Sequence, residues 1–91
     1  MHYVYVLESL DEAKVRYIGY SSDLKRRLEE HNSDDNHGFT RGREWRLLYY
    51  EAYLDKATAM KREKSLKTNG RARQMLYKRI GNPRSSEPKP R

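Results

Sequence analysis

The sequence contains no cysteine, which excludes both a disulfide framework and a thiolate metal site. No apolar run is long enough to cross a membrane or to form the core of a signal peptide, so we expect a cytoplasmic protein with no membrane partner. A chain of 91 residues forms one small domain and has no room for a second core. Its stability must therefore come from a compact apolar core.

Phenylalanine is also scarce, with one residue against eight tyrosines, whereas basic residues are in excess. Tyrosine packs as an apolar ring and keeps a hydroxyl, which suits a wet functional face. Twenty lysines and arginines against thirteen acidic residues give a formal net charge of +7. This balance favours a polyanionic partner, most simply nucleic acid, because the basic residues neutralise phosphates and release counterions. The alternative is an ordinary well-charged surface.

Three segments have the β-branched and aromatic composition of strands, at residues 2–7, 15–19 and 46–53. The first has almost no polar residue and predicts a buried, central strand. The short connection to the second predicts an antiparallel hairpin, with Tyr17 and Gly19 on one face and Ile18 on the other. If Tyr5 pairs with Tyr17, two phenols lie side by side across this hairpin.

A first helix is predicted at residues 24–31, with Ser21 or Ser22 as its N-cap. Its buried stripe is set by two leucines, Leu24 and Leu28. Arg27 and His31 fall within the same arc at the helical period of about 100° per residue. Both side chains should therefore face the sheet, although most helices this basic turn their arginines to solvent.

A second helix is predicted at residues 56–67, capped by Asp55, with Ala59, Met60 and Leu66 on its apolar side. Glu63 falls inside that apolar arc, where a carboxylate needs a compensating cation, proton or metal. Two interpretations are open: an ion pair with a neighbouring lysine or arginine, or a metal ligand directed at residues 17–31.

The remaining segments are more polar. Residues 32–44 form a long connection of the kind that often carries function; Thr40, Arg41 and Arg43 could contact phosphates there, and His37 is expected to be solvated. Asn69 and the following glycine should end the second helix. A third helix at residues 71–80 is expected to turn three residues inward: Met75, Leu76 and Ile80. Residues 81–91 contain all three prolines and predict a disordered basic tail beyond a domain of residues 1–80.

These residues could hydrolyse a phosphodiester, a reaction that needs a deprotonated water and neutralised phosphate charge. Glu63 could hold one hard divalent cation, because water and phosphate oxygens can complete the shell of Mg²⁺. Arg27 could bind the phosphate with its planar fork, and Tyr17 or His31 could take the proton. In the structural alternative, the tyrosines are core rings, Arg27 is an ion-pair partner, and His31 is a C-terminal helix residue favoured by the helix dipole. The sequence has neither paired carboxylates nor a His/Cys zinc pattern.

The motif YVY at residues 3–5, followed by YIG at residues 17–19, resembles the two-part signature of the GIY-YIG endonucleases. The later stretches GYSSDLKRRLEEHN, TRGREWRLLYYEAY and AMKREKSLK are similar to small stand-alone proteins of that family. The resemblance covers residues 2–80. It implies an α+β fold, a three-stranded antiparallel sheet flanked by helices in the order β-β-α-β-α-α, and phosphodiester hydrolysis with one divalent ion.

Carried over by position, the resemblance implies a set of catalytic side chains. Tyr17 resembles the residue that activates water, and Tyr5 its supporting phenol. Arg27 matches the arginine that stabilises phosphate charge, and His31 a position near the nucleophile or leaving group. Glu63 matches the single metal-binding glutamate. Further contacts with substrate are expected at six positions: Gly19, Tyr20, Arg41, Arg43, Lys67 and Asn69.

The chain also departs from the family pattern. Tyr3 and Val4 stand where the first motif has glycine and isoleucine, and Tyr20 stands where some branches have lysine. We expect no appended DNA-binding domain, so recognition should fall to the sheet face, residues 32–44 and the basic C-terminal segment.

The sequence therefore predicts an endonuclease that depends on Mg²⁺ or Mn²⁺, uses no small-molecule cofactor and cleaves DNA. With so little surface for reading a duplex groove, we expect selectivity for single-stranded or structured DNA, with tyrosines and Trp45 stacking on exposed bases. The alternatives are a non-catalytic nucleic-acid-binding module with the same fold and a nuclease that acts on RNA. The oligomeric state is left open.

Overall fold

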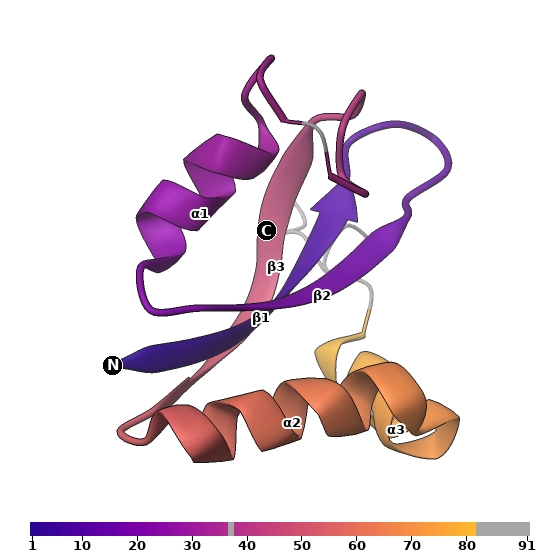
Figure 1. The fold of residues 1–91 in the computed structure, drawn as a ribbon. Helices are drawn as coiled ribbons and strands as arrows, with labels where there is room; N and C mark the ends of the chain where they lie inside the picture. Colours follow the sequence, from indigo (N-terminus) through magenta and orange to yellow (C-terminus); the bar gives the residue numbers. More distant parts are fainter. Residues whose placement is uncertain (37, 82–91) are drawn as a thin grey trace, which may run out of the picture.

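A three-stranded antiparallel sheet carries helices on both of its faces (Figure 1). The strands β1 (His2–Ser9), β2 (Arg16–Ser21) and β3 (Trp45–Tyr53) lie in the order β2-β1-β3. The helices α1 (Leu24–His31), α2 (Lys56–Thr68) and α3 (Gly70–Ile80) complete the predicted order β-β-α-β-α-α. The prediction of a central first strand is confirmed.

The computed structural model describes residues 1–36 and 38–81. The expected solvation of His37 and the expected basic tail beyond residue 81 therefore lie outside the described residues. Within the described part of the chain, no helix is long and apolar enough to cross a membrane.

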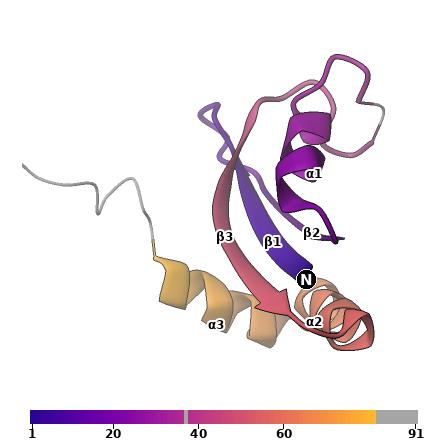
Figure 2. The ribbon, with the colours of Figure 1, turned by 90° about the vertical axis from the view of Figure 1, so that its left-hand side faces the viewer.

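Strand β1 divides the core between the two faces of the sheet, because successive side chains of a strand point in opposite directions. Val4 and Val6 belong to a cluster built with α2 and α3, whereas Tyr5 and Leu7 belong to a cluster closed by Trp45 and by the leucines of α1. Figure 2 shows α1 and α3 on opposite sides of the sheet. The near absence of polar residues in β1 follows from this double burial.

The register of the hairpin differs from the pairing considered from the sequence. Tyr5 lies opposite Gly19, and Leu7 lies opposite Tyr17, so the direct pairing of Tyr5 with Tyr17 is wrong. The turn sets this register: the Ser9 hydroxyl accepts a hydrogen bond from the Val15 amide at 2.7 Å, and the two residues also bond through their main chains. The strand then continues beyond Gly19 to Ser21.

The helix ends confirm some sequence signals and correct others. Asp55 caps α2 as predicted, accepting from the Thr58 amide at 2.8 Å. The N-cap of α1 is Asp23, whereas Ser21 bonds to the main chain of Asp23 and shapes the turn before the helix. The predicted cap at Ser21 or Ser22 is therefore wrong, by two residues or by one, because the Asp23 carboxylate reaches the first-turn amide of Arg26.

Two methionines predicted to face inward are exposed, Met60 on α2 and Met75 on α3. The buried residues of α2 are Ala59 and Leu66, which are seven positions apart and define a narrow stripe. Leu76 alone is fully buried on α3, with Ile80 packed against the same cluster. A stripe this narrow leaves the adjacent positions in solvent.

Asn69 separates α2 from α3. It is the C-cap of the first helix and the N-cap of the second, and its side chain accepts from the Arg71 and Ala72 amides at 3.0 and 3.1 Å. This confirms the predicted helix stop. The guanidinium of Arg73 then folds back and donates to the Leu66 carbonyl at 3.1 Å, satisfying a carbonyl at the end of α2.

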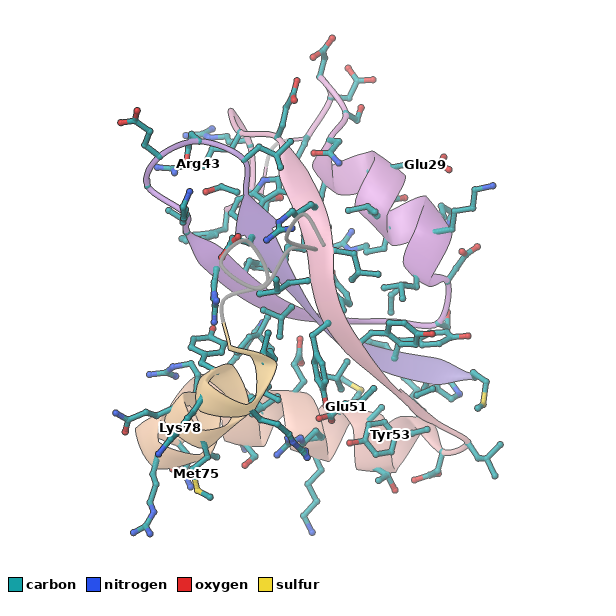
Figure 3. All side chains as sticks on the ribbon, turned by 180° about the vertical axis from the view of Figure 1, so that it is seen from behind. Glu29, Arg43, Glu51, Tyr53, Met75 and Lys78 are labelled. Atoms are coloured by element: carbon teal, nitrogen blue, oxygen red, sulfur yellow. The ribbon has the colours of Figure 1, made fainter. Side chains whose placement is uncertain are left out.

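A partly buried carboxylate, Glu51, links α2 to β3. Glu51 accepts hydrogen bonds from the hydroxyls of Tyr49 and Tyr53 at 2.7 and 2.5 Å and from Arg62 at 2.9 and 3.0 Å. Burial alone would raise the pKa of Glu51, but the hydrogen bonds from Arg62 and the two tyrosines lower it to about 2. Figure 3 shows Glu51 and Tyr53 where β3 passes over α2. The interaction holds α2, and with it Glu63, against the sheet.

Candidate active site

His31 lies at the centre of a hydrogen-bonded chain between α1 and the sheet. It is buried on the last turn of α1, and its Nε2 lies 2.7 Å from the Tyr5 hydroxyl. On the other side of the ring, Nδ1 lies 2.6 Å from Oγ1 of Thr40. Burial lowers the pKa of His31 below its ordinary value, and the positive charge of Arg27 acts in the same direction. The imidazole is therefore neutral near pH 7, with one nitrogen donating and the other accepting.

Two proton arrangements satisfy this chain. In one, Nδ1–H of His31 donates to Thr40, and Nε2 accepts the proton of the Tyr5 hydroxyl. In the other, Thr40 donates to Nδ1, and Nε2–H donates to the phenol oxygen of Tyr5, which leaves the phenol proton free to point elsewhere. The orientation of the Thr40 hydroxyl thus decides which proton Tyr5 can offer.

Thr40 belongs to this buried chain, whereas its position in a polar stretch predicts a phosphate contact. Its side chain is 2% exposed, and its hydroxyl also accepts from Asn36 Nδ2 at 2.7 Å. The same Asn36 amide donates to the His31 carbonyl at 2.9 Å, which ties the connection to the end of α1. An isolated threonine in a polar stretch has no periodic pattern, so only the folded connection identifies its role.

Trp45 lies against the connection formed by residues 32–44 and is 3% exposed. Its Nε1–H donates to the Thr40 carbonyl at 2.7 Å, and Asn32 bonds to both main-chain groups of Trp45. The expectation that Trp45 could stack on exposed bases is therefore wrong, because the indole is used inside the protein.

The two tyrosines of the motifs lie in different environments. Tyr5 is fully buried, and burial raises its pKa to about 12, an effect that a hydrogen bond with Arg27 only partly offsets. Tyr17 is half-buried at the edge strand, with its ring centroid 5.2 Å from that of His31 and 6.5 Å from that of Tyr5. Tyr17 is thus the phenol of the pair that solvent can reach.

Gly19 is required by the packing of Tyr5. A Cβ added at Gly19 would lie 2.5 Å from Cζ of Tyr5, closer still to its hydroxyl oxygen, and 3.0 Å from Cε2 of Tyr17. These distances are shorter than side-chain atoms tolerate. Glycine at this position therefore lets the Tyr5 ring lie flat across the neighbouring strand and reach His31.

Arg27 stands at the open side of the site. It projects from the middle of α1, is half-buried, and donates from Nη1 to the Glu30 carboxylate at 3.1 Å. Its guanidinium also hydrogen-bonds to the Tyr5 phenol, which opposes the larger, pKa-raising effect of burial on Tyr5. The predicted orientation of Arg27 and His31 toward the sheet is confirmed by these contacts.

Helix α2 contributes Glu63 and Lys67. Lys67 Nζ lies 3.2 Å from Oε2 of Glu63 and 5.4 Å from the centroid of the Tyr17 ring. Of the two interpretations of Glu63, the ion pair is present in the structure. The same pair brings the carboxylate to the edge of the sheet where Tyr17 lies.

The donor set limits which metal could be held here. Among the described residues, no group of three or more His, Cys, Asp or Glu side chains could hold an ion. A single carboxylate, Glu63, fits a hard cation that keeps most of its water, as Mg²⁺ does, and does not fit zinc.

Four other predicted contact residues lie apart from this group. Tyr20 packs on the opposite face of the sheet and is hydrogen-bonded to His2 Nδ1 at 2.7 Å. Arg43 pairs with Asp11 at 3.0 Å, and Arg41 is exposed in the same connection. Asn69 serves as the cap between α2 and α3.

Comparison with known proteins agrees with the fold and the motifs. Residues 1–78 match the family model of the GIY-YIG catalytic domain. The chain is 42% identical over 73 residues to a UPF0213 protein of Halobacterium salinarum, covering 79% of this chain and 92% of the relative. It is 41% identical over 76 residues to a UPF0213 protein of Streptococcus agalactiae, covering 82% and 84%.

Among solved structures, the solution NMR structure of a UPF0213 protein from Bacillus halodurans superimposes with a TM-score of 0.55. The two are 31% identical, and the match covers 94% of this chain and 93% of the other. With the three-stranded sheet, the helix order and the family match all in agreement, the chain belongs to the GIY-YIG family of nuclease domains.

Proposed function

We propose that this protein is an endonuclease that hydrolyses DNA phosphodiester bonds with the help of one divalent cation, Mg²⁺ or Mn²⁺. The observation that carries the proposal is the grouping of a histidine, an arginine and a carboxylate around the phenol pair of Tyr5 and Tyr17. Phosphodiester hydrolysis needs these groups, because a proton must be moved and negative charge must be neutralised.

In this proposal Tyr17 is the group that takes the proton from the attacking water. Tyr5 is less suited to that role, because a phenol with a pKa of about 12 gives up its own proton with difficulty. Tyr17 is half-buried, so water can reach its hydroxyl, and the Lys67 ammonium lies over its ring. Tyr5 and His31 share a proton and hold the site in place.

Arg27 and Glu63 would handle the phosphate. The Arg27 fork, at the open side of the site, can bind two phosphate oxygens and stabilise the charge that develops on them. Glu63 would hold the cation, which when bound supplies positive charge at the phosphate and acidifies a water molecule. Lys67 would then release Glu63 and remain free for the substrate.

Selectivity for single-stranded or structured DNA follows from the size of this surface. The candidate residues lie on two neighbouring strands, β1 and β2, and on the helices α1 and α2, and Tyr17 itself is half-buried. A flexible or unpaired strand can bend into such a site more easily than a stiff duplex can. Arg41 and Lys67 are exposed candidates for further substrate contacts.

The test uses labelled single-stranded, duplex and branched DNA, each incubated with Mg²⁺, with Mn²⁺ or with EDTA. We expect cleavage by the native protein in either metal, none in EDTA, and a rate at least about 100-fold lower for Glu63→Gln and for Arg27→Ala. Glu29→Gln is the matched control, because Glu29 is an exposed carboxylate on the outer side of α1 (Figure 3). Equal cleavage by all four proteins would contradict the assignment.

A second candidate, a non-catalytic nucleic-acid-binding module, is favoured by the ion pair between Lys67 and Glu63, which neutralises the carboxylate. It predicts salt-sensitive binding without a metal-dependent product, and binding that Glu63→Gln leaves unchanged. Cleavage of RNA is distinguished by competition between matched DNA and RNA strands.

A further inference from the structure

Phe39, the only phenylalanine of the sequence, is an exposed ring beside the candidate site. Its side chain is 75% exposed, yet it is held in a defined position, stacked on Tyr17 with the ring centroids 5.8 Å apart and the planes inclined by 22°. One face of Phe39 is therefore covered by Tyr17, and much of the ring is left to solvent. A large apolar ring in this position is available to a ligand with a flat surface.

A hollow of about 350 Å³ adjoins this ring pair. Three aromatic side chains border it, Tyr17, Phe39 and Tyr77. Ile18 and three cations also line it, and the cations are Arg16, Lys67 and Arg73. We call this surface the aromatic-basic groove. It combines flat apolar faces with positive charge and runs from the edge strand β2 to α3.

The cations of the groove differ in how far their charge is already neutralised. Arg16 pairs with Glu8 at 3.4 Å and stands 4.7 Å above the Tyr77 ring, and Lys67 pairs with Glu63. Arg73 donates to the carbonyls of Leu66 and Lys67 and has no ion pair with a carboxylate among the described residues. The positive charge of Arg73 is therefore available to bind an anion.

We propose that the aromatic-basic groove is a subsite for one nucleotide of a single DNA strand next to the cleaved phosphate. The base stacks on Phe39, and the adjoining phosphate lies against Arg73. Every base has a π-face, so stacking of this kind tolerates sequence variation, and an unpaired base offers its face freely. The inference rests on the proposed function for its substrate class, and it adds Phe39 and Arg73, which no motif had indicated.

Binding is measured with the full chain in EDTA, by fluorescence anisotropy of a labelled oligothymidine, so that no cleavage interferes. Loss of a base-stacking ring typically weakens binding by about 5- to 150-fold. We expect a loss in that range for Phe39→Ala and near-native affinity for Phe39→Trp, which keeps a flat ring. Tyr50→Ala is the matched control, since Tyr50 is a 53% exposed aromatic on β3, the strand at the other edge of the sheet.

Arg73 is tested through the salt dependence of the same binding. Arg73→Gln should reduce the slope of log affinity against log salt by about one, whereas Lys78→Gln, an exposed cation on the outer side of α3, should leave the slope unchanged (Figure 3). Because Arg73 also bonds to the end of α2, thermal unfolding of each variant is measured in parallel. Phe39 has no such structural bond, so its variants test the subsite even if Arg73→Gln unfolds.

The outcomes separate this inference from the proposed function. Native affinity in Phe39→Ala, an equal loss in Tyr50→Ala, or a preference for duplex over single strand would overturn the subsite, even if the protein cleaves DNA. Tighter binding of oligouridine than of oligothymidine would overturn its assignment to DNA. Conversely, Phe39-dependent binding in a protein that cleaves nothing would leave the subsite standing and refute only the nuclease assignment.

Discussion

Replacing Thr40 with valine tests the buried hydrogen-bonded chain most directly, because valine keeps the branched shape of threonine and has a methyl group in place of the hydroxyl. The substitution removes two hydrogen bonds of Thr40 Oγ1, one with His31 Nδ1 at 2.6 Å and one from Asn36 Nδ2 at 2.7 Å. Leaving a buried polar group unpaired costs about 1–3 kcal/mol. Asn36 is half-buried and keeps its bond to the His31 carbonyl, so its share lies at the low end.

We therefore expect Thr40→Val to lower the free energy of unfolding by about 2–4 kcal/mol, a large fraction of the about 5–15 kcal/mol typical of a domain. For a domain of this size, each 1 kcal/mol lowers the melting temperature by about 4–8 °C, so the melting temperature should fall by about 10 °C or more. Urea denaturation monitored by circular dichroism measures the free energy, and a thermal scan checks the temperature.

Thr40→Ser is the control, since serine keeps the hydroxyl and loses one buried methyl group, at a cost of about 1 kcal/mol. The expected order of stability is native, then serine, then valine. If the valine variant proves as stable as the serine variant, the packing of the methyl group rather than the hydrogen bonds holds residue 40, and the description of a Tyr5–His31–Thr40 chain would be refuted.

Two further substitutions probe the packing and charge of the scaffold. Gly19→Ala should lower the free energy of unfolding, measured by urea denaturation, by about 1–3 kcal/mol, because the added methyl group meets the Tyr5 ring. Gly38→Ala is the control and should be nearly neutral, because the nearest contact of its methyl group would be 3.4 Å. Equal stability of the two variants would contradict this account. Glu51 has a folded pKa of about 2 against an ordinary 4.5, so its ionised form stabilises the fold above pH 4.5, and this contribution is lost as pH falls toward 2. Glu51→Gln should therefore be less stable than the native protein at neutral pH, with a difference that shrinks below pH 4.5; a constant difference across that range would be inconsistent with the Arg62 and tyrosine hydrogen bonds.

Local sequence determined most of the secondary structure and the general location of the site. The alternation of β1 assigned Val4 and Tyr5 to opposite faces, as the two core clusters confirm. The helical period turned Arg27 and His31 toward the sheet, and Asp55 and Asn69 marked helix ends. Each of these features depends on residues close together in the chain, so the pattern of the sequence is sufficient to predict it.

The pairing register, and with it the reason for Gly19, required the tertiary structure. Alternation states which face a residue takes but not which residue lies opposite, and the Ser9 turn decided that Tyr5 faces Gly19 and not Tyr17. A shift of β2 by two residues along β1 would have kept every side chain on its face while placing a residue other than Gly19 opposite Tyr5.

The connection at residues 32–44 shows the same limit most clearly. Its sequence does not show which of two aromatic rings is buried. Trp45 is 3% exposed, and its Nε1–H donates to the Thr40 carbonyl, whereas Phe39 is stacked on Tyr17 and remains 75% exposed. The composition of the sequence shows only that both rings are apolar. Which ring is buried depends on how the connection folds against α1 and β3, a contact between distant residues that only the tertiary structure decides.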